Sequence, residues 1–274
     1  MSLVVPILLV AVAAGLAVGA ILLVRRGAPD GSYFADGDRA AGVFGVITTG
    51  FSVLLGFIIF LGFESYDESR SGAETEATIV AQQIETAQFL PRATAGQLTG
   101  QLVCYARSVI GPEWEALEEG TLDDAINPWG AEMFRTLRAT DPQTAAEQSA
   151  YDRWMDQSAE RQQARIARIH GAEGIIPFPL WLVLFTIAGV IFVYMLFFAD
   201  SNERAVVQAL LMGSVVSVIV ALLLLLNTLD DPFHGGVGGL DPVAMERSLR
   251  IIDEALGAVD VQVSIPCDAE GVAS

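Results

Sequence analysis

Residues 40–90 read AAGVFGVITTGFSVLLGFIIFLGFESYDESRSGAETEATIVAQQIETAQFL and change character at Glu64. The part before Glu64 is apolar and exceeds the length of about 20 residues that a helix needs to cross a bilayer. The part after it is charged, yet it contains no proline before Pro91. We therefore expect one helix of roughly 75 Å, at 1.5 Å per residue, that crosses a membrane and continues into water.

Four apolar runs have the length of a membrane span, and none of them contains an Asp, Glu, Lys, Arg or His side chain. They are Leu3–Val24, Ala40–Phe63, Pro179–Phe198 and Ala205–Leu229. The first run lacks a basic n-region and is longer than an ordinary signal-peptide core, so a retained span is favoured over a cleaved signal peptide. A mean hydropathy of +0.49 agrees with several spans plus some aqueous mass.

The expected fold is all-α, with four transmembrane helices and an extramembrane helical bundle inserted between the second and third. The parts are 1–63 with spans 1 and 2, 64–178 with the bundle, 179–229 with spans 3 and 4, and 230–274 with an Asp-Pro-Phe turn, an amphipathic helix and a tail. No alternating strand pattern appears in the bundle.

Punctuating residues predict where the helices of the bundle and tail begin and end. One helix is expected to stop at Gly111-Pro112, and another to start with Asp141 as N-cap before Pro142 and to run to about His170. Asp241-Pro242 is expected to cap an amphipathic helix, and residues 260–274 to form a loose tail. The apolar face of that helix comprises Met245, Leu249, Ile252, Leu256 and Val259.

Arginine residues near the short loops predict the orientation. Arg25, Arg26 and Arg39 lie in or beside the first loop, and Arg204 lies in loop 199–204. These loops are expected in the cytoplasm, with the long segment 64–178 and the C-terminus extracytoplasmic, in the cell membrane. Three arginines that precede the third span oppose this orientation: Arg161, Arg165 and Arg168. The net charge of −18 argues against nucleic acid as a partner.

The second span carries small and polar residues at helical spacing. They are Gly45, Thr48, Thr49, Ser52 and Gly56. Small residues let helices approach closely in lipid, so helix packing is one interpretation of this stripe. The other is a face that lines a pore or meets a substrate.

Acidic residues follow the second and fourth spans at one membrane face. They are Glu64, Asp67, Glu68, Asp230 and Asp231. In an oligomer they would form an acidic ring that attracts cations at a pore mouth. Ordinary hydration of helix ends is the alternative, and a cation site with His234 is a third interpretation. The sequence contains none of the familiar catalytic, nucleotide-binding or metal motifs, so we expect neither an enzyme nor a cofactor or metal site.

The chain has two cysteines, Cys104 and Cys267. The predicted orientation places both outside the cytoplasm, where disulfides persist. A bridge would close a loop of about 160 residues and stabilise the fold by roughly 5 kcal/mol through the entropy of the unfolded chain. Cys104 as a small buried apolar residue is the alternative.

Several short stretches resemble the bestrophin-like family of bacterial and plastid membrane proteins, long described as a domain of unknown function. They are Leu54-Leu55-Gly56-Phe57, Glu76-Ala77, Leu90-Pro91, Tyr105 followed by Glu113-Trp114, and Leu229-Asp230-Asp231-Pro232-Phe233-His234-Gly235. The last one is similar to the family's Leu-Asp-x-Pro-Phe-x-Gly signature, and the resemblance extends to about residue 255. It implies kinship with bestrophin anion channels, which share the plan of two spans, helices and two spans. It also implies a cytoplasmic bundle, contrary to the arginine distribution.

Two functions remain open from the sequence. The first is an oligomeric ion channel or transporter-like protein for small ions. The second is a non-conducting envelope sensor or scaffold whose extracytoplasmic bundle binds a partner, which agrees with the absence of charge within the spans.

Overall fold

The computed structural model describes residues 4–121, 127–258 and 263–273. Within these ranges the chain is helical, has no strand, and pairs extended residues only at an isolated bridge between Cys267 and Ala273. The helices are α1 (Val4–Arg25), α2 (Gly37–Ala87), α3 (Arg92–Ser108), α4 (Trp114–Glu118), α5 (Trp129–Arg138), α6 (Ala145–His170), α7 (Phe178–Phe197), α8 (Ala205–Asp230) and α9 (Val243–Ala258). The predicted all-α fold is confirmed, and α2 is the single long helix expected from residues 40–90.

The chain divides into two compact units. The membrane unit comprises Met1–Ser65, Gly174–Asp231 and Gly236–Gly238, and the polar unit comprises Tyr66–Glu173, Pro232–Gly235 and Gly239–Ser274. Helix α2 contributes its first half to the membrane unit and its second half to the polar unit.

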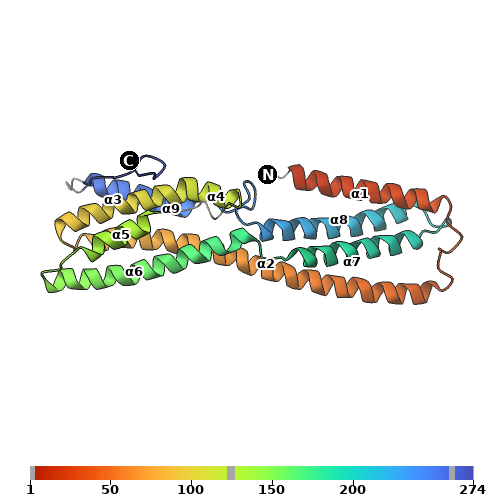
Figure 1. The fold of residues 1–274 in the computed structure, drawn as a ribbon. Helices are drawn as coiled ribbons and strands as arrows, with labels where there is room; N and C mark the ends of the chain where they lie inside the picture. The colour runs from red at the N-terminus through yellow and green to blue at the C-terminus, as the bar shows by residue number, and fades with distance from the viewer. Residues whose placement is uncertain (1–3, 122–126, 259–262, 274) are drawn as a thin grey trace. The chain divides into compact units, whose positions relative to one another are not determined.

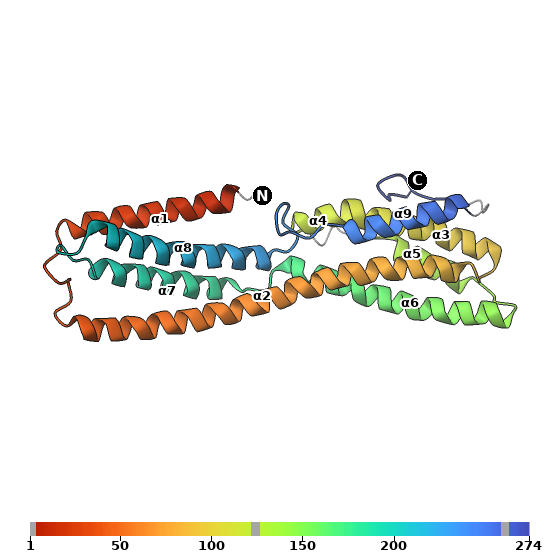
Figure 2. The same cartoon turned by 180° about the vertical axis from the view of Figure 1, so that it is seen from behind.

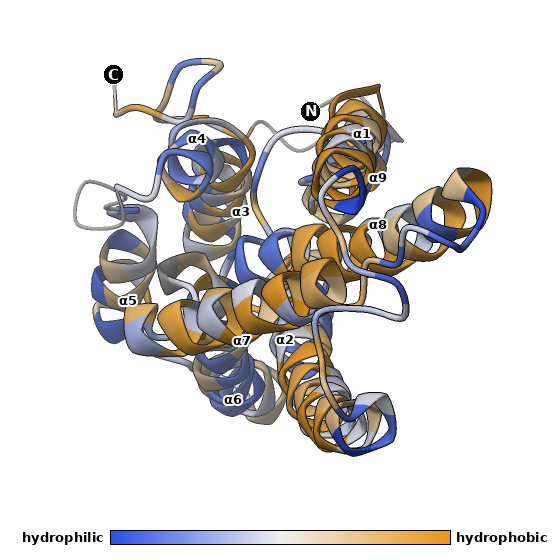
Figure 3. Ribbon diagram, turned by 90° about the vertical axis from the view of Figure 1, so that its right-hand side faces the viewer, coloured by the Kyte–Doolittle hydropathy of each residue, from blue (hydrophilic) through white to orange (hydrophobic). Residues whose placement is uncertain are grey.

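In the membrane unit, α1, α7, α8 and the first half of α2 run side by side (Figures 1 and 2). All four helices are long and apolar enough to span a membrane, and only 11–17% of their apolar windows is buried. In Figure 3 these helices are coloured mostly orange, the colour of hydrophobic residues. Buried contacts among Leu55, Ile191 and Leu226 join α2, α7 and α8. The exposed remainder is typical of helices that face lipid or other subunits.

Two loops interlock at one end of the membrane unit. Arg25 donates from Nη2 to the carbonyl oxygen of Ser201 at 2.8 Å, and the N–H of Gly31 donates to Asp200 Oδ1 at 3.1 Å. The loops after α1 and α7 therefore lie on the same face, as the arginine argument assumed.

In the polar unit, the second half of α2 packs with α3, α5, α6 and α9. The core includes Val80, Leu102, Met133, Trp154 and Ile252, one from each of these helices. This half of the chain is thus a helical bundle with its own hydrophobic core, as the periodicity predicted. Val259 lies outside the described residues, as does the side chain of Leu256.

Two predicted helix boundaries are wrong. The helix expected to stop at Gly111-Pro112 continues through a π-helical turn, Val109–Glu113, into α4. The longer hydrogen-bonding step of a π turn accommodates a proline that has no N–H to donate.

The N-cap of α6 is Thr144 rather than Asp141. Thr144 Oγ1 accepts from the N–H of Glu147, whose carboxylate accepts from the N–H of Thr144. This reciprocal capping box satisfies two backbone donors, whereas an aspartate cap supplies one acceptor.

Candidate functional site

A cluster of buried charged side chains lies in the middle of the polar unit. Glu76 comes from α2, Tyr105 from α3, Glu113 from the π-helical turn and Arg168 from α6, and each is at most 3% exposed. Helices α2 and α6 approach closely here because position 72 is glycine. A Cβ at Gly72 would lie 2.5 Å from the backbone nitrogen of Arg168.

Arg168 connects the two glutamates. Its Nε donates to Glu76 Oε2 at 2.6 Å, and its Nη2 donates to Glu76 Oε1 at 3.4 Å and to Glu113 Oε1 at 2.7 Å. The Tyr105 hydroxyl donates to Glu76 Oε1. The guanidinium is thus forked between two carboxylates, an arrangement that arginine makes and lysine cannot reproduce.

Further polar groups surround this core. Arg165 donates from Nε to Glu113 Oε1 at 2.9 Å, and Asn127 donates from Nδ2 to Glu113 Oε2 at 3.2 Å. The Arg161 guanidinium lies 4.7 Å from the centroid of the Tyr105 ring. The cluster therefore gathers three arginines and two glutamates in a largely desolvated volume.

Burial and neighbouring charge shift the pKa values of this cluster in opposite directions. Burial, reinforced by Glu76, raises the pKa of Tyr105 well above its ordinary value, so the phenol stays neutral. Burial alone would lower the pKa of Arg168, but attraction to Glu76 and Glu113 outweighs it and raises that pKa. The pKa of Arg161 is lowered because burial outweighs its neighbours.

Three of the stretches singled out from the sequence meet around this cluster, namely Glu76-Ala77, Tyr105 with Glu113-Trp114, and the stretch that contains Pro232-Phe233. Trp114 stacks edge-on against Phe233 with ring centroids 5.3 Å apart, and the Arg168 guanidinium lies 5.8 Å from the Trp114 ring centroid. Pro232 approaches the end of α6, where a Cβ at Gly171 would lie 3.0 Å from its Cγ. Glu76, Tyr105, Glu113, Trp114, Pro232 and Phe233 thus belong to one constellation in the polar unit.

Sequence reasoning missed the centre of this constellation. From the sequence, Arg168 was recognised only as a positive charge before the third span that opposes the predicted orientation. In the structure it is fully buried and paired with two carboxylates. The signal available in the sequence was its spacing of seven from Arg161, which places both on one face of α6.

The family model of the bestrophin-like domain matches residues 11–238. The chain belongs to the bestrophin-like family. A comparison with curated proteins gave no match. Among solved structures, a point variant of a bacterial bestrophin homologue from Klebsiella pneumoniae is 12% identical, with a TM-score of 0.69 over 89% of this chain and 98% of that chain. Another variant of that homologue is 14% identical, with a TM-score of 0.64 over the same shares of the two chains.

A further solved structure, described only as a membrane protein variant, is 14% identical, with a TM-score of 0.67 over 92% of this chain and 98% of that chain. At these identities the likeness concerns the fold. The expected membership of the bestrophin-like family and the expected helical membrane architecture are both confirmed.

In this bestrophin-like chain a disulfide joins Cys104 on α3 to Cys267 near the C-terminus. It fixes residues 263–273, which we call the C-terminal strap, against α3. Trp129 donates from Nε1 to the carbonyl oxygen of Gly271 at 2.7 Å, and a Cβ at Gly100 would lie 2.1 Å from the carbonyl oxygen of Ser264. The expectation of a loose tail is wrong for these residues, because a covalent bond and close backbone contacts hold them.

The small-residue stripe lies on an uncovered face of α2 in the membrane unit. Gly45, Thr49, Ser52 and Gly56 are exposed, and Thr48 is half-buried. A Cβ added at Gly45 or Gly56 would meet nothing within 4 Å. Thr48, Ser52 and Gly56 line a groove of about 390 Å³ that Ile191 of α7 and Val218 of α8 also line. The two glycines therefore make no close helix contact, although the stripe borders α7 and α8 across this groove.

The five acidic residues near the membrane face have different environments. Asp230 accepts from the N–H groups of Ile175 and Ile176 at 2.9 Å each and from Trp181 Nε1 at 3.3 Å. It ties the end of α8 to the segment before α7, whereas Glu64 is exposed. The remaining three, Asp67, Glu68 and Asp231, are exposed as well. Within the described ranges, no three His, Cys, Asp or Glu side chains are grouped to hold a metal ion.

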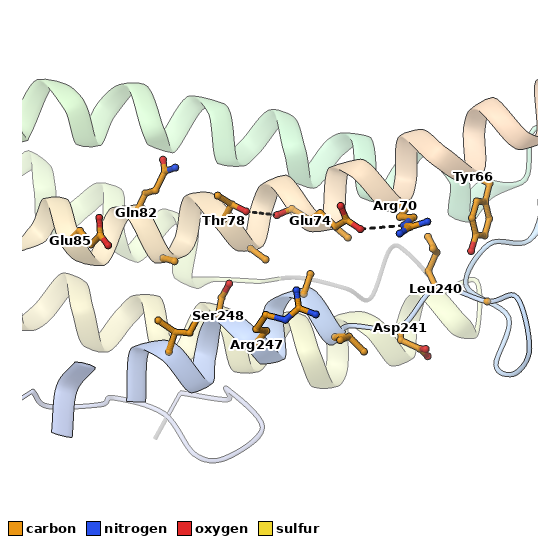
Figure 4. Close-up of a pocket in the computed structure, with 17 residues that line it drawn as sticks. Tyr66, Arg70, Glu74, Thr78, Gln82, Glu85, Leu240, Asp241, Arg247 and Ser248 are labelled. Atoms are coloured by element: carbon orange, nitrogen blue, oxygen red, sulfur yellow. Dashed lines mark hydrogen bonds and ion pairs between the residues drawn. The ribbon is translucent and has the colours of Figure 1, made fainter. Parts of the chain in front are cut away.

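A groove of about 760 Å³ runs between the second half of α2 and α9. Figure 4 shows Arg247 projecting from α9 toward α2, where Arg70 pairs with Glu74 at 3.2 Å. All three of these side chains line the groove, and so does Glu85. The walls of the groove therefore carry both positive and negative charges. This mixed lining is typical of a surface that meets another protein rather than of an enclosed small-molecule site.

Proposed function

We propose that the chain is a subunit of an oligomeric ion channel, with the stripe of α2 beside the ion path. The uncovered stripe is the observation that carries this proposal. Gly62 differs from the glycines of the stripe. A Cβ added at Gly62 would lie 3.2 Å from Leu229 Cβ, so this glycine allows close packing inside the subunit. The glycines of the stripe have no such neighbour, so the face remains for an aqueous path or for adjacent subunits.

The hydroxyl groups of the stripe suit a narrow aqueous path. Thr48 Oγ1 donates to the carbonyl oxygen of Phe44 at 3.0 Å, and Ser52 Oγ donates to that of Thr48 at 2.8 Å. Each hydroxyl hydrogen is therefore used within α2, which leaves lone pairs on the two oxygens to interact with other groups. Such oxygens solvate cations without the cost of a buried charge.

Kinship with bestrophins supports a channel, while the acidic residues favour a cation over an anion. Glu64 follows the apolar part of α2 and is exposed. In a ring of subunits it would contribute one carboxylate per chain near the mouth. Asp230 is engaged with backbone N–H groups and is not available for this role.

A thiol placed on the stripe tests this proposal directly, because no described cysteine is free. Ser52→Cys should react with a water-soluble, membrane-impermeant thiol reagent and lose most of its conductance in reconstituted bilayers. Leu210→Cys is the matched control, since Leu210 is 68% exposed on the apolar helix α8. Equal effects at both sites, or no conductance for any common ion from intact oligomers, would reject the channel.

We further propose that the polar unit lies outside the cytoplasm of the cell membrane. The disulfide between Cys104 and Cys267 supports this, because such bridges persist in oxidising compartments and are rare in the cytosol. Glu160→Cys on α6 should be labelled by an impermeant maleimide in intact cells, whereas Ser201→Cys should be labelled only after lysis. The reverse pattern would place the polar unit in the cytoplasm.

The groove between α2 and α9 favours a second function, a non-conducting envelope sensor or scaffold whose polar unit binds a partner. Within the described spans, α1, α7 and α8 carry no ionisable side chain at their centres, which agrees with a protein that moves no ion. The flux experiment separates the two functions. If bilayers stay silent while oligomers remain intact, the sensor or scaffold becomes the better proposal.

A further inference from the structure

A cavity lies between α5 and α6, next to the buried cluster. It measures about 280 Å³ and is lined by Phe134, Leu137, Trp154, Met155, Ser158 and Arg161, among others. Phe134 and Met155 are 54% and 38% exposed, so they form its rim. Trp154 and Arg161 are buried and form its inner part.

Arg161 differs from the other two arginines of the cluster. It is only 6% exposed, yet within the described part of the chain it forms no ion pair, whereas Arg165 and Arg168 pair with glutamates. Its Nη1 donates to the neutral Gln83 Oε1 at 2.6 Å. The same Nη1 lies 3.6 Å from Met133 Sδ, and the guanidinium lies over the face of the Tyr105 ring, so these further contacts are also with uncharged groups.

Burying a cation without a counter-ion costs free energy, and the carboxylates near Arg161 do not offset this cost. The two buried glutamates already face Arg165 and Arg168, so the cluster as a whole has one more arginine than carboxylates. Burial lowers the pKa of Arg161 in spite of attraction to Tyr105 and Glu76. An anion beside Arg161 would therefore be stabilised by an interaction that the protein itself leaves unmade.

The geometry points to a small organic carboxylate as the ligand of this cavity, with its anionic end on Arg161 and its apolar part between Trp154 and Leu137. A guanidinium presents paired donors that match a carboxylate. Apolar walls favour an organic anion over a strongly hydrated inorganic one. The volume is just below the range of about 300–1,000 Å³ for ordinary ligand pockets, which indicates a small molecule.

A ligand bound to Arg161 would be linked to the buried cluster through a short chain of side-chain contacts. Arg161 lies over the Tyr105 ring, and the Tyr105 hydroxyl donates to Glu76, which holds Arg168. This inference does not depend on the proposed channel, because the site lies wholly in the polar unit.

Calorimetric titration of the purified full-length protein tests the inference, with benzoate and acetate as probes and benzamide as the neutral isostere of benzoate. We expect benzoate to bind at least tenfold more tightly than benzamide. Arg161→Gln should abolish that preference. Arg135→Gln, which changes a neighbouring exposed arginine on α5, should leave it unchanged.

Phe134→Trp provides an independent arm, because it narrows the exposed rim and leaves Arg161 in place. We expect it to weaken benzoate binding at least fivefold with an unchanged melting temperature, so the test holds even if Arg161→Gln fails to fold. Equal affinity for benzoate and benzamide, or unaltered binding in the Phe134 variant, would overturn the inference. The absence of any binding would also overturn the inference. This includes an absence that arises because an acidic side chain of a second copy of the chain already fills the cavity.

Discussion

Arg168 Nε lies 2.6 Å from Glu76 Oε2, and neither side chain is exposed to solvent. The two residues are 92 positions apart, so this pair joins α2 and α6 at the centre of the polar unit. Both ions give up their hydration when the unit folds. The pair is therefore stable only while both members are present.

Removing one member of this pair should be strongly destabilising. Arg168→Met should lower the free energy of unfolding by about 3–5 kcal/mol, because it leaves the buried carboxylate of Glu76 without its cation and leaves Glu113 with Arg165 alone. Urea titration of the detergent-solubilised protein measures this. Arg70→Gln is the control, because it breaks an exposed Arg70–Glu74 pair on α2 worth about 0–1 kcal/mol. Similar losses in both variants would show that the buried pair has no special role.

Tyr105 should make stability dependent on pH in the alkaline range. The raised pKa keeps the phenol protonated in the folded state, while an unfolded tyrosine ionises near pH 10. The unfolded state then binds fewer protons, so stability is level below about pH 10 and falls above it. Tyr105→Phe should lose about 1.5–3 kcal/mol at pH 8 through the missing bond to Glu76 and fall less steeply from pH 10 to 11. Parallel curves for the two proteins would contradict this assignment.

The disulfide should couple the C-terminal strap to the stability of α3. Replacing both Cys104 and Cys267 by serine should cost about 2–5 kcal/mol, because the bridge spans 163 positions and limits the unfolded chain. Gly100→Ala should also destabilise, since its Cβ would collide with the carbonyl oxygen of Ser264. Mass spectrometry of protein from native membranes, without reductant, should find the two cysteines linked. Free thiols in that preparation would remove the support for an extracytoplasmic polar unit.

Gly72 and Gly45 should respond in opposite ways to alanine. At Gly72 a Cβ would lie 2.5 Å from Arg168 N and 2.8 Å from Ala164 O, both backbone atoms, so Gly72→Ala should cost about 1–3 kcal/mol or more. At Gly45 nothing lies within 4 Å, and alanine favours a helix by up to about 1 kcal/mol. Melting temperatures of the two variants provide the comparison. An effect of Gly45→Ala on conductance or oligomer size, without loss of stability, would support the proposed role of the stripe.

Substitutions at Glu64 and at Asp230 should have different effects, the first on ion selectivity and the second on stability. Asp230→Asn weakens the acceptor for Ile175 and Ile176, so it should lower the melting temperature by several degrees. Glu64→Gln changes an exposed carboxylate and should leave the melting temperature unchanged while reducing cation preference in reversal-potential measurements. Unchanged selectivity in the Glu64 variant would reject the acidic ring.

Elements that depend on local composition followed from the sequence. Four apolar runs predicted four spans, and the absence of proline between Glu64 and Leu90 predicted one continuous α2. Both inferences rest on short-range physics, the cost of burying polar groups in lipid and the cost of interrupting a helix. The two wrong boundaries have local causes: at Asp141 the reciprocal capping box of Thr144 and Glu147 is used instead, and at Pro112 a π-helical turn accommodates the proline.

The amino-acid sequence by itself determined that this chain is an all-α membrane protein of the bestrophin-like family, because length, apolarity and short motifs are properties of contiguous residues. Only the tertiary structure decided that Arg168 is the buried centre of the cluster, that Arg161 borders a cavity without a counter-ion, and that the stripe of α2 is uncovered. An arginine is solvated or buried according to which distant helices pack against it. A long helix such as α6 offers every side to such packing, and the choice is made by contacts between residues far apart in the chain.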